Sequence, residues 1–256
     1  MLTILSPAKS LDFSPHPTTP SEPDLLADTA KLLPVLRKKT ADDLSAMMKI
    51  SEKLATLNEE RYQTFAIPQP DSAKAAIFAF DGDVYQGFAP QGQSEATIAY
   101  AQDHLRILSG LYGLLRPLDR IQPYRLEMGT RLATDRGSNL YHFWGSRIAE
   151  ALNEALAASG SDILVNLASN EYYKAVDRKT LKAQIIAPAF RELRKGKPQM
   201  ISFFAKQARG SMAAYLMREE ICDEAGLLAF AEDGYRYDAE LSKPGVPMFI
   251  RPSTAK

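Results

Sequence analysis

The sequence holds only one cysteine, Cys222, so no disulfide can form within the chain. It has no apolar run near the ~20 residues that a helix needs to cross a bilayer. The opening residues, MLTILSPAKSLDF, lack the basic start and the long apolar stretch of a secretory signal peptide. Together these absences predict a protein of the reducing cytoplasm that has no membrane partner.

Histidine is also scarce, and His16, His104 and His142 are scattered along the chain. None of them pairs with another histidine, or with Cys222, at a spacing typical of a metal site. The Walker A motif, the dinucleotide-binding glycine motif and Gly-x-Ser-x-Gly are absent as well. We therefore expect no cofactor and no metal site built on histidine or cysteine. A carboxylate site for a hard cation stays open, because such cations need only oxygen ligands.

The chain carries no net charge, because its 31 lysines and arginines balance 31 aspartates and glutamates. A typical nucleic-acid-binding domain is basic overall. The balance therefore argues against a basic surface all round the protein. A nucleic-acid partner is compatible with it only if the cations gather in a local patch and the acidic residues lie elsewhere.

Helical and strand-like segments are interspersed along the chain, which indicates a mixed α/β (α+β) fold. The length of 256 residues suits one large domain, and we expect a single domain over 1–256. Strands are predicted at 2–5, 75–80, 123–128, 162–169, 184–190 and 199–204, with an antiparallel pair at 235–241 and 246–252. Helices are predicted within 24–66, from Ser94 to about 108, and at 139–158, 170–176 and 205–220.

The segment LSGLYGLLRPLDRIQPYRLEM (108–128) combines a glycine-rich turn with closely spaced arginines. It resembles a helix-hairpin-helix, at about 95–120, in which glycines let backbone N–H groups face a phosphate. The candidate phosphate-binding turn consists of Gly110, Leu111, Tyr112 and Gly113. Arginine can grip the same phosphate bidentately, and the candidates that follow the turn are Arg116, Arg120 and Arg125.

The glycines of this turn lie three residues apart rather than the usual two, so the motif is a variant. A second interpretation is a helix C-cap followed by a loop. In that case the arginines are solvated or pair with Asp103, Asp119 and Glu127. The residues alone leave both interpretations open.

Two further candidate sites follow predicted strands, where open α/β sheets usually bind ligands. SPAK (6–9) comes after the first strand, and Lys9 would supply a fixed ammonium, or a nucleophile if burial lowered its pKa. After a later strand, Ser169 can cap a short helix that carries Glu171 and Lys174. The alternatives are a surface lysine in the first case and an ordinary capped helix in the second.

The last long predicted helix carries a basic pair and a face of small residues. Lys206 and Arg209 lie three residues apart and therefore share a helix face. Gly210, Ala213 and Ala214 form a small-residue face that allows another element to pack closely. The alternative for the basic pair is an ordinary exposed position.

Four segments in this order, LSPAKSLDF, LSGLYGLLRPLDRIQPYRLEMGT, LVNLASNEYYKAV and FAKQARGSMAAYL, resemble the YaaA family of peroxide-stress-response proteins over nearly the full length. The resemblance implies a bacterial, cytoplasmic protein that limits unincorporated iron, and with it hydroxyl-radical damage to DNA and protein. It also implies an unusual α/β fold with a positively charged cleft and a helix-hairpin-helix associated with DNA binding. Carried onto this chain, the cleft would draw on Lys9, Arg116, Arg120, Arg125, Lys174, Lys206 and Arg209.

On these grounds we expect a protein that binds DNA, duplex or branched, through phosphate contacts with little sequence selectivity. An alternative hypothesis is an enzyme that acts on a nucleotide or a damaged DNA base, with Lys9 and Glu171 as candidate catalytic residues. A third hypothesis follows from the effect on unincorporated iron that the resemblance implies. In it, the protein binds the metal directly through carboxylate ligands.

Overall fold

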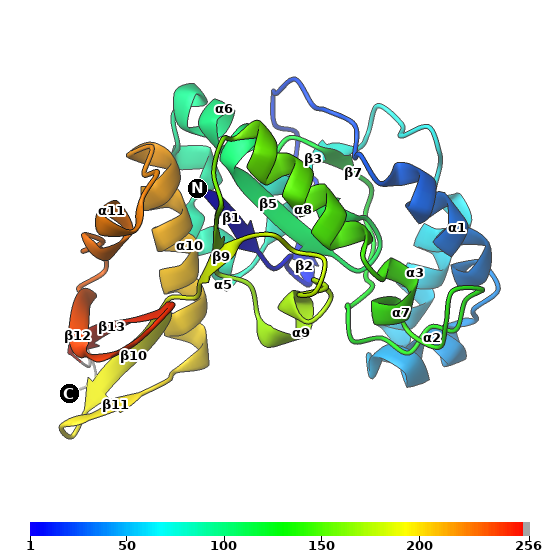
Figure 1. Cartoon of the computed structure of the whole chain (residues 1–256). Helices are drawn as coiled ribbons and strands as arrows, with labels where there is room; N and C mark the ends of the chain where they lie inside the picture. The colour runs from blue at the N-terminus through cyan, green and yellow to red at the C-terminus, as the bar shows by residue number, and fades with distance from the viewer. Residues whose placement is uncertain (253–256) are drawn as a thin grey trace.

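The middle of the molecule is a five-stranded sheet, seen in the computed structural model, which describes residues 1–252 (Figure 1). In spatial order its strands are β6 (Gly113–Leu115), β5 (Leu105–Ser109), β1 (Leu2–Leu5), β8 (Ile163–Asn166) and β9 (Gln184–Ile186). All neighbours are parallel except β5 and β6, which form an antiparallel hairpin. Every residue of β1 is buried, which is typical of a central parallel strand that is covered on both faces.

Helices pack around this sheet and extend beyond both of its ends. They are α1 (Leu26–Leu36), α2 (Ala41–Met48), α3 (Glu52–Thr64), α4 (Ala76–Ala79), α5 (Asp83–Phe88), α6 (Glu95–His104), α7 (Leu140–Trp144), α8 (Arg147–Ala158), α9 (Asn170–Tyr173), α10 (Ser202–Arg218) and α11 (Glu224–Leu228), with a 3₁₀ turn at Pro90–Gly92. Several begin at the hydroxyl or carboxamide cap that the sequence supplies. Thr40 and Asp43 form a capping box on α2, and Ser94 and Ser169 cap α6 and α9.

A second, four-stranded sheet lies at one end of the molecule, and α1, α2, α3 and α7 lie together at the other (Figure 1). The strands of the second sheet are, in spatial order, β11 (Lys197–Gln199), β10 (Ala189–Arg194), β13 (Val246–Pro252) and β12 (Arg236–Lys243). Two short antiparallel pairs complete the strands: β2 (Ser10–Leu11) with β4 (Phe80–Asp81), and β3 (Lys74–Ala75) with β7 (Arg120–Ile121).

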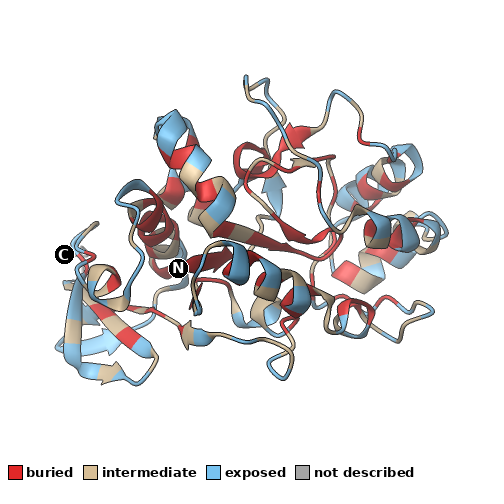
Figure 2. Cartoon of the chain, turned by 45° about the horizontal axis from the view of Figure 1, so that its top comes forward, coloured by how far each residue is buried: buried red, intermediate tan, exposed pale blue. Residues whose placement is uncertain are grey.

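The buried residues form one continuous apolar cluster that runs from the central sheet into the second sheet. Figure 2 shows the strands of the central sheet as buried, whereas the second sheet mixes buried and exposed positions. Phe190 and Phe249 of the second sheet pack against Phe230, which follows α11, with ring centroids 5.6–6.2 Å apart. Within the second sheet the buried Glu192 carboxylate pairs with Arg251 and accepts a hydrogen bond from Tyr235.

Three of the predicted elements differ from the structure in their type or in where they end. The strand predicted at 75–80 is instead the short helix α4 between β3 and β4. All of its residues are buried, and a fully buried run has no periodicity that separates helix from strand. The helix predicted to reach about 108 ends at His104, where β5 follows directly. The helix predicted at 139–158 is broken at Gly145, whose φ is +51°.

The remaining differences lie near the second sheet and in the segment before α7. Residues 123–128, predicted as a strand, form an irregular segment. The strand predicted at 199–204 is replaced by the end of β11 and the start of α10. The predicted strand at 2–5 and the predicted antiparallel pair near the C-terminal end of the described chain are confirmed. The mixed α/β class is confirmed as well.

Candidate functional site

The order of the strands points to one place on the central sheet. From β1 the chain builds β5 and β6 on one side, and later β8 and β9 on the other. The order therefore reverses between β1 and β8. In open α/β sheets, ligands bind outside the carboxyl ends of the strands at such a reversal. A pocket of about 470 Å³ lies there, lined by residues that follow both strands, and we call it the switch-point pocket.

The two loops that line the pocket are tied to each other. The Ser169 N–H donates to Ser6 Oγ at 2.9 Å, and Ser6 Oγ donates to Ser169 Oγ at 3.3 Å. The buried Tyr85 hydroxyl donates to the carbonyl oxygen of Ser6 at 3.0 Å. The loop after β1 is therefore held from both sides, by the start of α9 and by α5.

Helices α5 and α10 pack so closely that their backbones meet beside the pocket. A Cβ added at Gly210 would lie 1.8 Å from the Val84 carbonyl oxygen, and one added at Gly87 would lie 2.1 Å from that of Gln207. The close packing predicted for the small face of α10 is thus confirmed. It brings the Lys206 ammonium to 3.1 Å from the Asp83 carboxylate.

Arg209 lines the same pocket one helical turn further along α10. Within residues 1–252 its guanidinium has neither a hydrogen-bond acceptor nor an acidic partner. Burial, and then the nearby positive charge of Arg191, lower the pKa of Arg209. The two residues of the predicted basic pair therefore differ. Lys206 forms an ion pair with Asp83, whereas Arg209 lines the pocket and its guanidinium has no partner among the described residues.

Lys9 and Glu171, the predicted catalytic pair, both line the switch-point pocket, but each is paired with another group. The Lys9 ammonium, whose side chain is 65% exposed, lies 3.0 Å from Glu127. Arg125 contacts the same carboxylate group at 3.0 Å. Glu171 instead accepts the backbone N–H of Gly129 at 2.9 Å. The carboxylate beside Lys9 is thus Glu127.

Lys174 lies at the edge of this cluster. Its ammonium is 4.9 Å from the centre of the Tyr141 ring, a cation–π distance. The Tyr141 hydroxyl donates to the carbonyl oxygen of Glu171 at 3.1 Å. Lys174 is therefore attached to the loop after β8, but it does not line the pocket itself.

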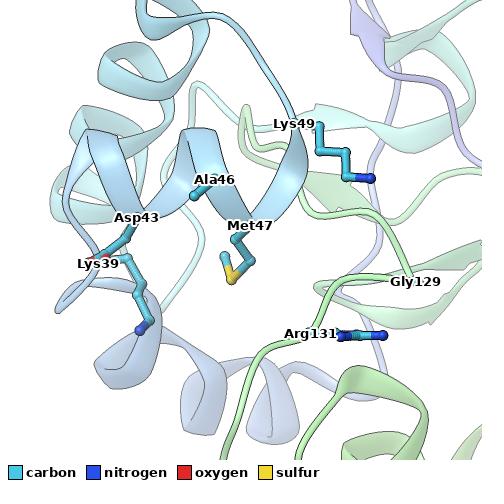
Figure 3. A pocket seen from close by; sticks show the side chains of 7 residues that line it. All are labelled: Lys39, Asp43, Ala46, Met47, Lys49, Gly129 and Arg131. Atoms are coloured by element: carbon cyan, nitrogen blue, oxygen red, sulfur yellow. The ribbon is translucent and has the colours of Figure 1, made fainter.

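A second pocket, of about 680 Å³, lies between α2 and the segment around Gly129, and we call it the α2 pocket (Figure 3). It is lined by Lys39, Asp43, Ala46, Met47, Lys49, Gly129 and Arg131. Three of these side chains are cationic and one is acidic. Gly129 connects the two pockets, because its N–H bonds to Glu171 of the switch-point pocket.

The α2 pocket also includes the turn between two helices. Lys49 ends α2 in the left-handed conformation, with φ +53°, and its N–H donates to the Ser45 carbonyl oxygen. Ser51 then caps α3 by accepting the N–H of Leu54. Two helices are thus joined by three residues, Lys49, Ile50 and Ser51. Helices were predicted within 24–66, but no hairpin was predicted at this turn.

The helix-hairpin-helix predicted at about 95–120 is wrong as a secondary-structure assignment. Helix α6 is followed by two strands, β5 and β6, and residues 110–113 are all buried. A Cβ at Gly113 would lie 2.6 Å from the ring of Trp144, whose indole N–H donates to the Gly110 carbonyl oxygen at 3.0 Å. A Cβ at Gly110 would lie 2.2 Å from the Leu126 carbonyl oxygen, so both glycines are required by tertiary contacts. The buried backbone donors of Leu111 and Tyr112 are not available to a phosphate at the surface.

Arg116 and Arg120 line neither of the two pockets. Arg116 donates to Asp119 at 3.0 Å and to the carbonyl oxygen of Glu22 at 2.7 Å. Arg120 pairs with the Glu22 carboxylate. Both guanidinium groups thus fasten the loop before α1 to the segment after β6. From the second interpretation, the pairing of Arg116 with Asp119 and of Arg125 with Glu127 is confirmed. Its helix C-cap is wrong, because β5 and β6 occupy that part of the segment.

Three residues that line the switch-point pocket were not predicted from the sequence, namely Asp81, Asp83 and Tyr85. The signal in the sequence is the pair of carboxylates in DGD (81–83), which directly follows an apolar run. Among residues 1–252 no group of three His, Cys, Asp or Glu side chains is placed to hold a metal ion. No helix of the described chain has the length and apolar character needed to cross a membrane.

Comparison with known proteins gives a match over almost the whole chain. A family model described as peroxide stress protein YaaA matches residues 1–241. A UPF0246 protein of Shewanella baltica is 52% identical over 257 residues, which cover 98% of this chain and 99% of the relative. A UPF0246 protein of Alteromonas mediterranea is 51% identical over 254 residues, with 98% of each chain covered. One from Shewanella oneidensis is 49% identical over 254 residues, with 98% and 99% covered.

Proposed function

Because the chain belongs to the peroxide stress protein YaaA family, we propose that it acts in the peroxide-stress response by binding DNA. Binding is to duplex or branched DNA in the cytoplasm, and it limits iron-dependent oxidative damage. The protein holds the phosphate backbone rather than base edges, so its sequence selectivity is weak. The surface used is the row of cations around the α2 pocket and the switch-point pocket.

The observation that carries this proposal is the charge of the α2 pocket. Lys39, Lys49 and Arg131 line it with only one carboxylate, Asp43. In Figure 3 the side chains of Lys49 and Arg131 come from opposite walls, one from the end of α2 and one from the segment after Gly129. Cations on two walls of an open groove match the two sides of a phosphate backbone.

The cation row continues from Gly129 toward the switch-point pocket. The groups there are Lys9, Arg125, Lys174, Lys206 and Arg209. The chain has no net charge, so a local row of this kind is offset by acidic residues elsewhere. This arrangement orients the protein on DNA without causing non-specific binding over its whole surface.

We propose that α2, α3 and the turn between them act as the DNA-binding helix-hairpin-helix, which was predicted from the sequence at about 95–120. The turn between them contains Lys49, and α3 presents its positive dipole end at Ser51. The proposed surface does not include residues 110–113, which are buried, or Arg116 and Arg120, which line neither pocket.

The test is a salt series on duplex, branched and single-stranded DNA, followed by fluorescence anisotropy. Replacing Lys49 and Arg131 together by glutamine removes two phosphate contacts. The slope of log affinity against log salt should then fall by roughly two, for all sequences alike. Lys182→Gln with Lys197→Gln is the matched control, because it removes the same charge from exposed positions outside both pockets. An equal effect of the two double variants would refute the proposed surface.

A further inference from the structure

The unused donors of Arg209 are the first sign that the switch-point pocket holds a specific ligand. The guanidinium is partly buried, and this burial, together with the nearby cation Arg191, lowers its pKa. A desolvated charge of this kind is costly unless an opposite charge approaches it. Its planar, forked donors match a carboxylate or a phosphate. The pocket therefore contains a place for an anionic group.

Asp81 is the complementary feature. Its carboxylate lines the pocket at the end of β4, and among residues 1–252 it has neither a cation within salt-bridge distance nor a hydrogen-bond donor. Asp81 and Arg209 form no ion pair with each other, and the ion pair at this pocket joins Lys206 and Asp83. A bare anion would satisfy only Arg209. A ligand that uses both groups carries an anionic group and, separately, hydrogen-bond donors.

One part of the pocket wall, beside its polar and charged residues, is apolar or aromatic. Pro7, Ala8, Val84, Leu167 and Tyr172 contribute to it. Such a wall suits a flat ring, which gains from burial against carbon atoms and an aromatic side chain. The volume of about 470 Å³ lies in the range of ligand sites for small molecules. The chemistry required is therefore an anion, a set of N–H or O–H donors and a ring.

We propose that the switch-point pocket binds one nucleoside monophosphate unit, with its phosphate at Arg209 and donors of its base or sugar at Asp81. The choice of a nucleotide among ring-bearing anions rests on the proposed DNA-binding function. The unit is either a free nucleotide or one unpaired nucleotide of a DNA strand. Both present the same phosphate, sugar and base to the pocket.

Titration calorimetry of the full chain separates the parts of the ligand. Deoxynucleoside monophosphates should bind more tightly than either inorganic phosphate or the matching deoxynucleosides. Arg209→Gln should weaken nucleotide binding by roughly tenfold to a hundredfold, because a charged hydrogen-bonded pair is lost. Asp81→Asn, at an exposed position, should weaken binding of the nucleotide but not of phosphate. A nucleotide that binds no more tightly than phosphate would overturn the proposal.

Two DNA substrates then distinguish the source of the nucleotide, a fully paired duplex and the same duplex with one unpaired nucleotide. A preference for the second, reduced by Asp81→Asn, identifies the ligand as part of a strand. Free-nucleotide binding without such a preference identifies a free nucleotide. If neither result is obtained, the pocket proposal is refuted. If duplex binding that depends on Lys49 and Arg131 persists in that case, the proposed DNA-binding function still stands.

Discussion

Replacing Gly210 by alanine should destabilise the protein, although alanine is the better helix former. In an isolated helix the change would add about 1 kcal/mol of stability, because glycine costs about that much in a helix interior. Here the new Cβ would lie 1.8 Å from the Val84 carbonyl oxygen and 2.7 Å from the Phe88 backbone nitrogen. The nearer contact is about 1.6 Å short of ordinary van der Waals distance.

The magnitude follows from what can move at this contact. Both obstructing atoms belong to the backbone of α5, so no side chain can turn aside, and the two helices must separate. Overpacking of a tight interior costs up to about 3 kcal/mol, which the gain in helix propensity reduces to a net loss of about 2 kcal/mol. For a chain of this size that corresponds to a fall of about 4–8 °C in Tm.

The assay is urea or thermal unfolding of the wild type and the variant, followed by circular dichroism. Gly92→Ala is the matched control, because no atom lies within 4 Å of a Cβ placed there, and its Tm should stay nearly unchanged. A Gly210→Ala variant as stable as the wild type would refute the close approach of α5 and α10. Lys206 and Arg209 follow the same helix, so nucleotide binding is expected to weaken together with stability.

Two further predictions concern parts of the chain outside the proposed site. Arg116→Ala should destabilise the fold by about 1–2 kcal/mol, because it leaves the buried Asp119 carboxylate with fewer donors, and it should leave the salt slope of DNA binding as it is. A flattened slope with unchanged Tm would contradict this. Burial raises the pKa values of Tyr62, Tyr85, Tyr112, Tyr124 and Tyr172. Their neutral phenols contribute stability that is complete below about pH 10, where unfolded tyrosine ionises, and that is lost as the pH rises further. The tyrosinate absorbance of these five side chains should therefore appear together with the loss of helical circular dichroism, and ionisation of all 11 tyrosines in a protein that stays folded would speak against it.

Local features of the site could be predicted from the sequence, because they depend on residues close together in the chain. The strand at 2–5 and the cap at Ser169 follow from short patterns, and the rule that ligands bind at strand ends brings Lys9 and Glu171 to one pocket. The partners of these residues could not be predicted in this way. Glu127 reaches Lys9 from an irregular segment, and no periodicity marks it.

The glycines at 110 and 113 show the opposite limit, where a local pattern has a tertiary cause. Two glycines near arginines are typical of a phosphate-binding turn. Here Gly113 is required because the Trp144 ring occupies the space of its Cβ, and Trp144 lies 31 residues further along the chain. Arg116 and Arg120 instead bind Glu22 and Asp119, and Glu22 lies nearly a hundred residues away in sequence. A short window contains Asp119 but neither Trp144 nor Glu22.

The position of β1 in the sheet affects how the protein folds during its synthesis on the ribosome. β1 is complete at Leu5, yet its partners begin at Leu105 and Ile163. At a synthesis rate of roughly 5–20 residues per second, about 8–30 s pass between the appearance of β1 and of β8. Throughout that time an apolar strand with unpaired edges is exposed, which is a target for chaperones and a risk for aggregation. High contact order of this kind also predicts slow refolding, because distant segments must meet before the sheet gains stability.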